Sequence, residues 1–152
     1  MVGNGHSDAV GELMQRQRDS GQALVEFAIA VTVFLTLLMS IVDLGRGIYL
    51  YNGVSEAARE IARATSVHPG AIIGSSTQTA QVVATQQSLV PGLSSPTIQC
   101  VDITGTPVTA NCVPGDWVEV TVTAPYAPVT PLLSIGGFGR FTMQSTSTVQ
   151  IQ

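Results

Sequence analysis

The stretch that decides the fold is Gln22–Val42, QALVEFAIAVTVFLTLLMSIV, in which Glu26 is the one charged residue. From Phe27 onward this stretch is uncharged, and every face of the helix that it would form is apolar. A helix needs about 20 mostly apolar residues to cross a hydrocarbon layer of about 30 Å. A buried helix of a soluble domain is usually shorter and has a polar stripe. The sequence therefore predicts a transmembrane helix over residues 22–42.

The whole chain is unusually poor in charge. Its 152 residues are 45% hydrophobic and 11% charged, whereas ordinary soluble domains are about 25% charged. It contains no lysine, and its arginines are outnumbered by acids, which leaves a net charge of -4. A nucleic-acid partner is not expected, because the chain lacks a basic surface to neutralise phosphates. The same composition excludes intrinsic disorder for most of the chain.

A hydrophilic leader, residues 1–21, precedes the apolar run. A cleaved secretory signal fits poorly, because such a peptide starts with a short basic region directly before its apolar stretch. Arg16 and Arg18 favour a cytoplasmic N-terminus, but three more arginines follow the run before residue 64, so charge counting leaves the topology open.

The two cysteines, Cys100 and Cys112, lie in the C-terminal half and are spaced as across a hairpin. A disulfide between them would require an oxidising compartment, and two unlinked buried thiols are the alternative. No metal site is expected, because the two sulfurs lack nearby histidines. We expect a single-pass protein of the cell membrane with a cytoplasmic N-terminus and an extracytoplasmic head.

The acid within the apolar run requires an explanation, because a carboxylate at membrane depth is costly unless it snorkels, pairs or becomes protonated. The simplest interpretation is that Glu26 marks the membrane–water boundary. Its context, Gly21-Gln-Ala-Leu-Val-Glu26-Phe27 at the head of an apolar run, resembles the processing site of type IV-like prepilins. That resemblance implies that a membrane aspartyl peptidase, the prepilin peptidase, cuts between Gly21 and Gln22.

The residue types suit such processing. Gly21 would place no side chain in a tight peptidase cleft. Cleavage would create an ammonium group on Gln22, one helical turn from Glu26. In a helical bundle, Glu26 would neutralise the terminal ammonium of a neighbouring subunit, which offsets both desolvation penalties and fixes the register. We therefore predict a processing site at Gly21 and Gln22, and assembly residues at Glu26 and Phe27.

The sequence from Gly21 onward is similar to the TadE-like family of tight-adherence (Flp/Tad) pilus systems, and the likeness covers most of residues 21–152. The matching features are Gln22-Ala-Leu-Val-Glu26-Phe27, Asp43-x-x-Arg46, Tyr51-Asn52, Ala57-Ala-Arg-Glu60-x-Ala62-Arg63 and, further on, Pro125-Tyr126 and the stretch 128–133. The resemblance implies a non-enzymatic pilin-like protein needed for pilus assembly. Its partners would be the inner membrane, the prepilin peptidase, other pilin-like subunits and the assembly machinery. Phe27 stands where major pilins of this system often have tyrosine, which favours a minor pilin or pseudopilin.

The remainder predicts an α+β head. Helical spacing of apolar residues continues through residues 43–68, so one helix is expected from Gln22 to Ser66, ending before Pro69-Gly70. Residues 69–152 would form an extracytoplasmic head with antiparallel strands packed on that helix. The expected elements are a helix over 77–89, strands over 97–104, 108–113, 117–124 and 141–151, a turn over 105–107 and a long connection over 124–139.

No catalytic constellation is recognisable, and neither catalytic residues nor a cofactor is predicted. His6 falls in the leader and His68 precedes a predicted turn, and none of the common nucleophile, zinc or phosphate-loop motifs is present. Two other classes remain as alternatives. One is an uncleaved single-pass anchor that presents a surface binding domain or serves as an envelope scaffold. The other is a membrane-tethered hydrolase, for which no active site can be located.

Overall fold

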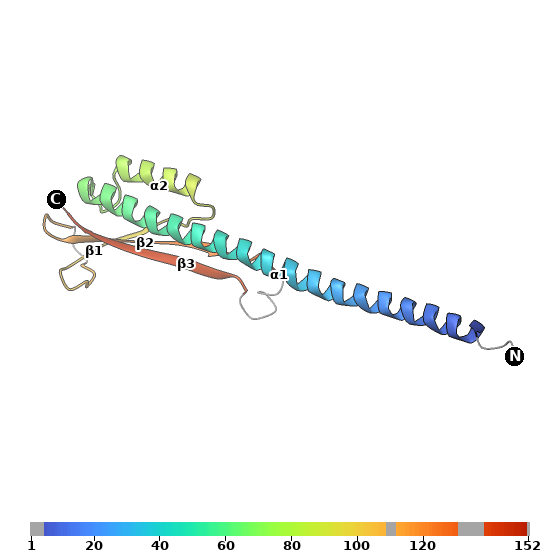
Figure 1. Ribbon diagram of the computed structural model, residues 1–152. Helices are drawn as coiled ribbons and strands as arrows, with labels where there is room; N and C mark the ends of the chain where they lie inside the picture. The colour runs from blue at the N-terminus through green and yellow to red at the C-terminus, as the bar shows by residue number, and fades with distance from the viewer. Residues whose placement is uncertain (1–4, 109–111, 131–138, 152) are drawn as a thin grey trace. The chain divides into compact units, whose positions relative to one another are not determined.

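The structure, a computed structural model, describes residues 5–108, 112–130 and 139–151, with side chains from residue 21 onward. Its elements are α1 (Gly5–Val67), α2 (Thr77–Leu89), β1 (Thr97–Val101), β2 (Trp117–Tyr126) and β3 (Phe141–Gln150) (Figure 1). The chain divides into two compact units, Met1–Ile41 and Val42–Gln152, and α1 contributes to both. The predicted α+β class, with a long N-terminal helix and a small antiparallel sheet, is confirmed.

Helix α1 begins earlier than expected, at Gly5 rather than at Gln22. Residues 12–18 of the leader are Glu, Leu, Met, Gln and Arg, which all have high helix propensity, and no proline interrupts them. The polar composition of the leader therefore does not prevent it from continuing the helix.

In the first unit, no side chain from residue 21 to residue 41 is buried. From Gly21 onward, α1 is long and apolar enough to cross a membrane, and none of its most apolar window is covered by the rest of the chain. The hydroxyl groups within the run are satisfied inside the helix. Thr32 donates to the carbonyl oxygen of Ala28 at 2.7 Å, Thr36 to that of Thr32 at 2.8 Å, and Ser40 to that of Thr36 at 2.9 Å. A lipid environment tolerates such hydroxyls because no polar group is left unpaired. This part of α1 is a candidate membrane span.

The second unit begins with the rest of α1, which ends at Val67, just before Pro69-Gly70 as predicted. Gly70 has a φ of +76°, and a Cβ atom there would lie 2.7 Å from the Oγ atom of Ser75, so glycine is needed in this turn. Helix α2 follows with the predicted bounds, and the Oγ atom of its N-cap residue, Ser76, accepts a hydrogen bond from the N–H of Thr79 at 3.1 Å.

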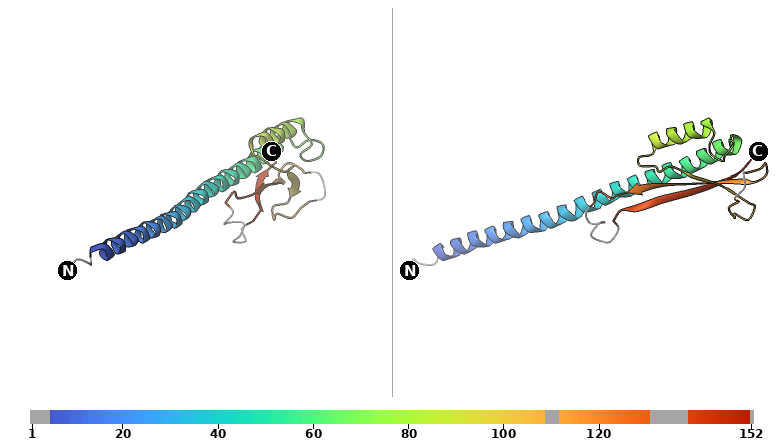
Figure 2. Two further views of the ribbon diagram at one scale, coloured as in Figure 1. Left: turned by 90° about the vertical axis from the view of Figure 1, so that its right-hand side faces the viewer. Right: turned by 180° about the vertical axis from the view of Figure 1, so that it is seen from behind.

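The sheet has the strand order β1-β2-β3 with both pairs antiparallel. Along β2, residues alternate between half-buried and buried up to Ala124, and Val118, Val120 and Val122 lie on the buried face. The three views place β3 alongside the second half of α1, with its last residues near the end of that helix (Figures 1 and 2). One face of the sheet therefore packs on the helices, and the threonine-rich face is exposed.

The hydrophobic core of the second unit lies between α1, the segment after α2 and the inner face of β2. It consists of Val54, Ala57, Ala58, Ile61, Ala62, Val90, Leu93, Val118, Val120, Val122, Ala124 and Ile151. Small residues on α1 allow close packing: a Cβ atom added to Gly53 would lie 3.1 Å from Cγ2 of Val90. By contrast, a Cβ atom added to Gly45 would meet nothing within 4 Å.

Three predictions for residues 97–113 were wrong in detail. The strand expected over 97–104 stops at Val101, because the Asp102 carboxylate accepts hydrogen bonds from the N–H groups of Thr104 and Thr106 at 2.8 and 2.9 Å. The turn is therefore over 102–105, earlier than expected. The described residues of 108–113 are not in a strand, although Pro107 forms an isolated bridge with Val101, and residues 109–111 lie outside the described part.

The connection expected over 124–139 starts later than predicted, because β2 continues to Tyr126 and pairs there with Phe141. Residues 131–138 of this connection lie outside the described part of the chain. The alternation of β2 continues through Ala124 and Tyr126, which are both buried, and burial of these two residues explains the extra length.

Candidate functional site

The residues predicted for processing and assembly lie on adjacent turns of α1 in the first unit. Gly21, Gln22, Glu26 and Phe27 are all exposed. Gln22 and Glu26 are four residues apart, so they share one face of the helix. A Cβ atom at Gly21 would meet nothing within 4 Å, so the packing of the chain does not require a glycine there. The bond between Gly21 and Gln22 is itself helical.

A second polar cluster surrounds Asp43, the residue directly after the predicted span. Its side chain is 2% exposed. The backbone N–H of Val129 donates to Oδ1 at 3.0 Å, and the N–H of Thr130 donates to Oδ2 at 2.7 Å. The hydroxyl of Thr130 also donates to Oδ2, and the guanidinium of Arg46 lies 3.5 Å from Oδ1. Both carboxylate oxygens therefore have partners, and they join α1 to the loop after β2.

These contacts stabilise the charged form of the carboxylate. The hydrogen bond from the Thr130 side chain is the main cause that holds the pKa of Asp43 below its usual range, and the N–H of Val129 and the charge of Arg46 act in the same direction. Burial opposes this shift but is outweighed. Asp43 therefore acts as an ionised anchor for the loop at neutral pH, with no proton to exchange near pH 7.

Tyr126 completes the cluster from the end of β2. Its hydroxyl donates to the backbone carbonyl oxygen of Asp43 at 2.6 Å, and burial, followed by the nearby charge of Asp43, raises the pKa of the phenol. Its ring centroid lies 5.1 Å from that of Phe141, at an interplanar angle of 48°. A Cβ atom on Gly47 would be 3.7 Å from the tyrosine ring, so α1 and the ring are in close contact. Through Tyr126, the ends of two strands are attached to α1.

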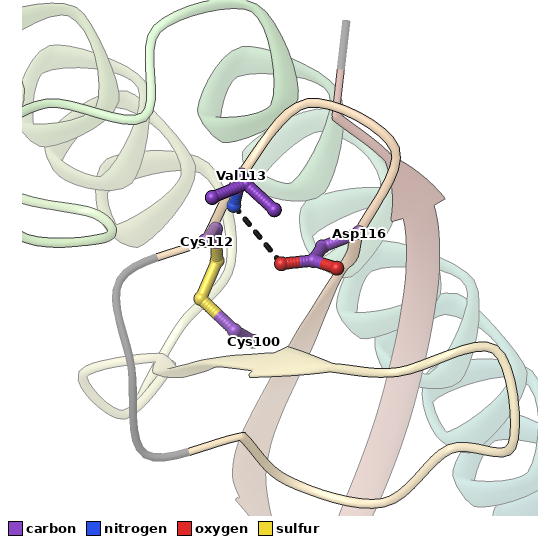
Figure 3. The surroundings of a disulfide bond; sticks show 4 residues. All are labelled: Cys100, Cys112, Val113 and Asp116. Atoms are coloured by element: carbon purple, nitrogen blue, oxygen red, sulfur yellow. Dashed lines mark hydrogen bonds between the residues drawn. A yellow bond between two sulfur atoms is a disulfide. The ribbon is translucent and has the colours of Figure 1, made fainter.

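The cysteines occupy the other end of the sheet. Cys100, in β1, and Cys112 are joined by a disulfide, with their Cα atoms 5.6 Å apart (Figure 3). The next residue, Val113, donates its N–H to Oδ2 of Asp116 at 2.9 Å, which shapes the turn into β2. The disulfide closes a loop over a sequence separation of 12 residues. Its occurrence in the cell depends on the compartment in which the head resides.

The structure brings Asp43, Tyr126 and Thr130 together, a relation that sequence reasoning did not foresee. Asp43 and Arg46 were noted only as features of the family resemblance, and Pro125-Tyr126 as a separate feature. An acid directly after an apolar run, with an arginine three residues later, was the available signal. It could not reveal the partners, because they are more than 80 residues away along the chain.

The described residues offer no arrangement that points to catalysis. Among them, no group of three or more histidine, cysteine, aspartate or glutamate side chains could hold a metal ion. On α1, Glu56 with Arg59 and Glu60 with Arg63 form opposite-charge pairs three residues apart, and of these four side chains only Glu60 is half-buried. The contacts of Asp43, Tyr126 and Thr130 anchor the loop after β2 to α1.

An apolar N-terminal helix that continues into a small α+β head is the arrangement of a pilin-like membrane protein. Residues 21–63 match the family described as TadE-like protein, which confirms the predicted resemblance over this segment. The match associates the segment with the pilin-like proteins of tight-adherence pili, and it lies within α1 and does not extend to the sheet. Comparisons with curated proteins and with solved structures found no match.

Proposed function

We propose that this chain is a non-enzymatic minor pilin or pseudopilin, cut by a prepilin peptidase after Gly21 and required to assemble a tight-adherence pilus. The observation that carries the proposal is the family match over residues 21–63, whose first residues, Gly21 to Glu26, stand at the head of an uncovered apolar helix. The chain would wait in the cell membrane with a cytoplasmic leader and an extracytoplasmic head.

The proposed role of Gly21 agrees with its surroundings. Because an added Cβ would touch nothing, the fold itself does not account for glycine at this position, whereas a peptidase cleft that excludes side chains does. The bond to be cut lies within α1, so the peptidase would have to unwind the helix locally. Glycine also favours that step, because it weakens a helix by about 1 kcal/mol relative to alanine.

Glu26 is proposed to set the register of assembly. After cleavage, the new ammonium group of Gln22 would lie one turn from Glu26 on the same helix face. In lipid, each charge is costly alone, and pairing the carboxylate with the ammonium group of an adjacent subunit satisfies both. Phe27 would pack against the neighbouring helix beside this pair.

Processing is tested by the intact mass of the protein extracted from membranes of cells that have the peptidase. We expect a chain that begins at Gln22, and Gly21→Ile should leave it uncut. Gly45→Ile is the matched control, because an added Cβ at either glycine of α1 would be unobstructed. A membrane-bound wild-type chain that still begins at Met1 would refute processing and support the uncleaved anchor.

Assembly is tested separately with Glu26→Gln, which keeps the shape of the side chain and removes its charge. We expect normal insertion and processing but a loss of pili on the cell surface. Glu56→Gln is the control, because Glu56 is an exposed acid on the same helix whose pair with Arg59 is solvated. Normal piliation with Glu26→Gln would contradict the proposed register role.

A further inference from the structure

One end of the second unit gathers residues from three parts of the chain. Asp43 on α1 binds the loop residues Val129 and Thr130 and accepts a hydrogen bond from Tyr126 at the end of β2. Tyr126 in turn pairs with Phe141, the first residue of β3. We name this region the proximal end and define it as residues 42–49, 126–130 and 139–141.

The exposed side chains of the proximal end are apolar and cationic. They are Val42, Leu44, Ile48, Tyr49, Ala127, Val129, Phe141, Arg46 and Arg140. Phe141 is 48% exposed and Val129 65% exposed, although Phe141 is paired with Tyr126 in the sheet and the N–H of Val129 donates to Asp43. The acid of the proximal end, Asp43, is buried and paired. The described surface here therefore presents Arg140 and the half-exposed side chain of Arg46, which also lies 3.5 Å from Asp43, among large apolar side chains and no exposed carboxylate.

The acids of the second unit lie elsewhere. Asp102, Asp116 and Glu119 are at or near the opposite end of the sheet, where Val101 pairs with Trp117. Glu119 is seven residues from Tyr126 along β2, which is about 23 Å at the rise of an extended strand. The remaining acids, Glu56 and Glu60, pair with arginines on α1. The head therefore has a charge asymmetry along the sheet, positive at the proximal end.

We propose that the proximal end docks on the headgroup layer of a membrane containing anionic phospholipid. Arg46 and Arg140 would bind lipid phosphates, and Phe141 and Val129 would insert among the headgroups. The proposal rests on the proposed function, because it requires residues 22–42 to span the membrane.

Chain connectivity makes a lipid surface the occupant that fits. Arg46 follows the last residue of the predicted span by four residues, so it cannot be more than about 14 Å from the end of that span. Arginine and aromatic side chains favour the membrane–water interface, where the cation meets phosphate and the ring remains among apolar groups. The arginines supply charge complementarity, and the exposed apolar side chains would be covered without another protein.

Depth-dependent fluorescence quenching tests the proposal on the full chain. The only tryptophan, Trp117, lies at the opposite end of the sheet. A reporter variant combines Trp117→Phe with Phe141→Trp. Both the reporter and the wild type are reconstituted in vesicles of phosphatidylcholine alone or mixed equally with phosphatidylglycerol. A fraction of the lipid is brominated next to the headgroup, and flotation measures membrane binding independently.

We expect the tryptophan introduced at the proximal end to be strongly quenched in phosphatidylglycerol vesicles, less so in neutral ones, and Trp117 to be unaffected. Arg46→Gln and Arg140→Gln should each lower the ratio of docked to undocked heads about fivefold. Arg59→Gln with Arg63→Gln is the control, because these exposed arginines lie further along α1 and should change nothing.

Equal quenching of the introduced tryptophan and of Trp117 in chains that float with vesicles would overturn the docking proposal and leave the membrane anchor intact. If quenching of the introduced tryptophan does not depend on phosphatidylglycerol, or if it rises with the amount of protein per vesicle, anionic lipid is not the partner of the proximal end. Either result would point to a second copy of this chain as the partner. Chains that do not float would overturn the docking and the anchor together.

Discussion

Replacing Tyr126 by phenylalanine removes one hydroxyl from the contact that joins β2 to α1. The hydroxyl donates to the carbonyl oxygen of Asp43 at 2.6 Å, and the residue is 7% exposed. The ring is unchanged, so its contacts with Phe141 and with α1 at Gly47 persist. The variant therefore isolates one buried, neutral hydrogen bond. Such a bond contributes about 1 kcal/mol to the free energy of unfolding.

The expected effect is a lower urea midpoint for unfolding of the head. With a denaturant dependence of about 2 kcal/mol per molar urea for a small domain, a loss of about 1 kcal/mol lowers the midpoint by about 0.5 M. The assay is urea unfolding of the full chain in detergent, followed by the fluorescence of Trp117, which lies at the other end of β2. Its signal therefore reports loss of the sheet and not of the membrane helix.

Tyr49→Phe is the matched control. Tyr49 lies on α1 and is 70% exposed, and its hydroxyl makes no hydrogen bond within the described residues. Its midpoint should equal that of the wild type. If Tyr126→Phe left the midpoint unchanged, or if both variants shifted it equally, the hydrogen bond to Asp43 would not contribute to stability as argued.

Three further predictions concern the stability of the head, with the urea midpoint as the measurement. Because the pKa of Asp43 is held low, the unfolded chain binds more protons than the folded chain below about pH 4, and stability is lost as the pH falls there. Asp43→Asn should lower the urea midpoint at neutral pH and make this loss at acid pH smaller. A variant whose midpoint falls with pH as steeply as that of the wild type would contradict the prediction. The double variant Cys100→Ser, Cys112→Ser should lower the free energy of unfolding by about 3 kcal/mol, the value for a disulfide that closes a loop of this length. Reduction of the wild type should lower it equally. A wild-type midpoint that does not change on reduction would count against a disulfide. Gly53→Leu should destabilise by about 1–3 kcal/mol, because the new Cβ approaches a core valine to 3.1 Å, whereas Gly45→Leu should have no such effect; the reverse order would contradict the packing argument.

The helices and most of the sheet could be predicted from the sequence because they depend on local periodicity. Thr77–Leu89 has a capping serine and a following proline, and β2 alternates apolar and polar residues, so both elements were placed correctly at their starts. One error lies where a side chain overrides local preference. Asp102 ends a strand by capturing two backbone N–H groups, a competition between side chain and ladder that alternation does not reveal.

The candidate site divides in the same way. The Gly21-to-Phe27 segment is a pattern of neighbours along one helix, so the sequence alone was sufficient to single it out. The Asp43 cluster joins residues that are more than 80 positions apart, and its partners are mostly backbone N–H groups that carry no sequence signature. Only the fold reveals that an acid after the apolar run is an anchor for a loop.

The amino-acid sequence by itself determined that this protein has an apolar helix of spanning length with an acid near its start, because a charge-free run of about 20 residues is more favourable in lipid than in water. It also determined the period of each helix and strand. Tertiary structure decided how the sheet lies along α1, and thereby which side chains share the proximal end. That choice depends on the close approach of Tyr126 to Gly47 and on the pairing of Asp43 with the loop. Both contacts become favourable only after the core has brought distant segments together.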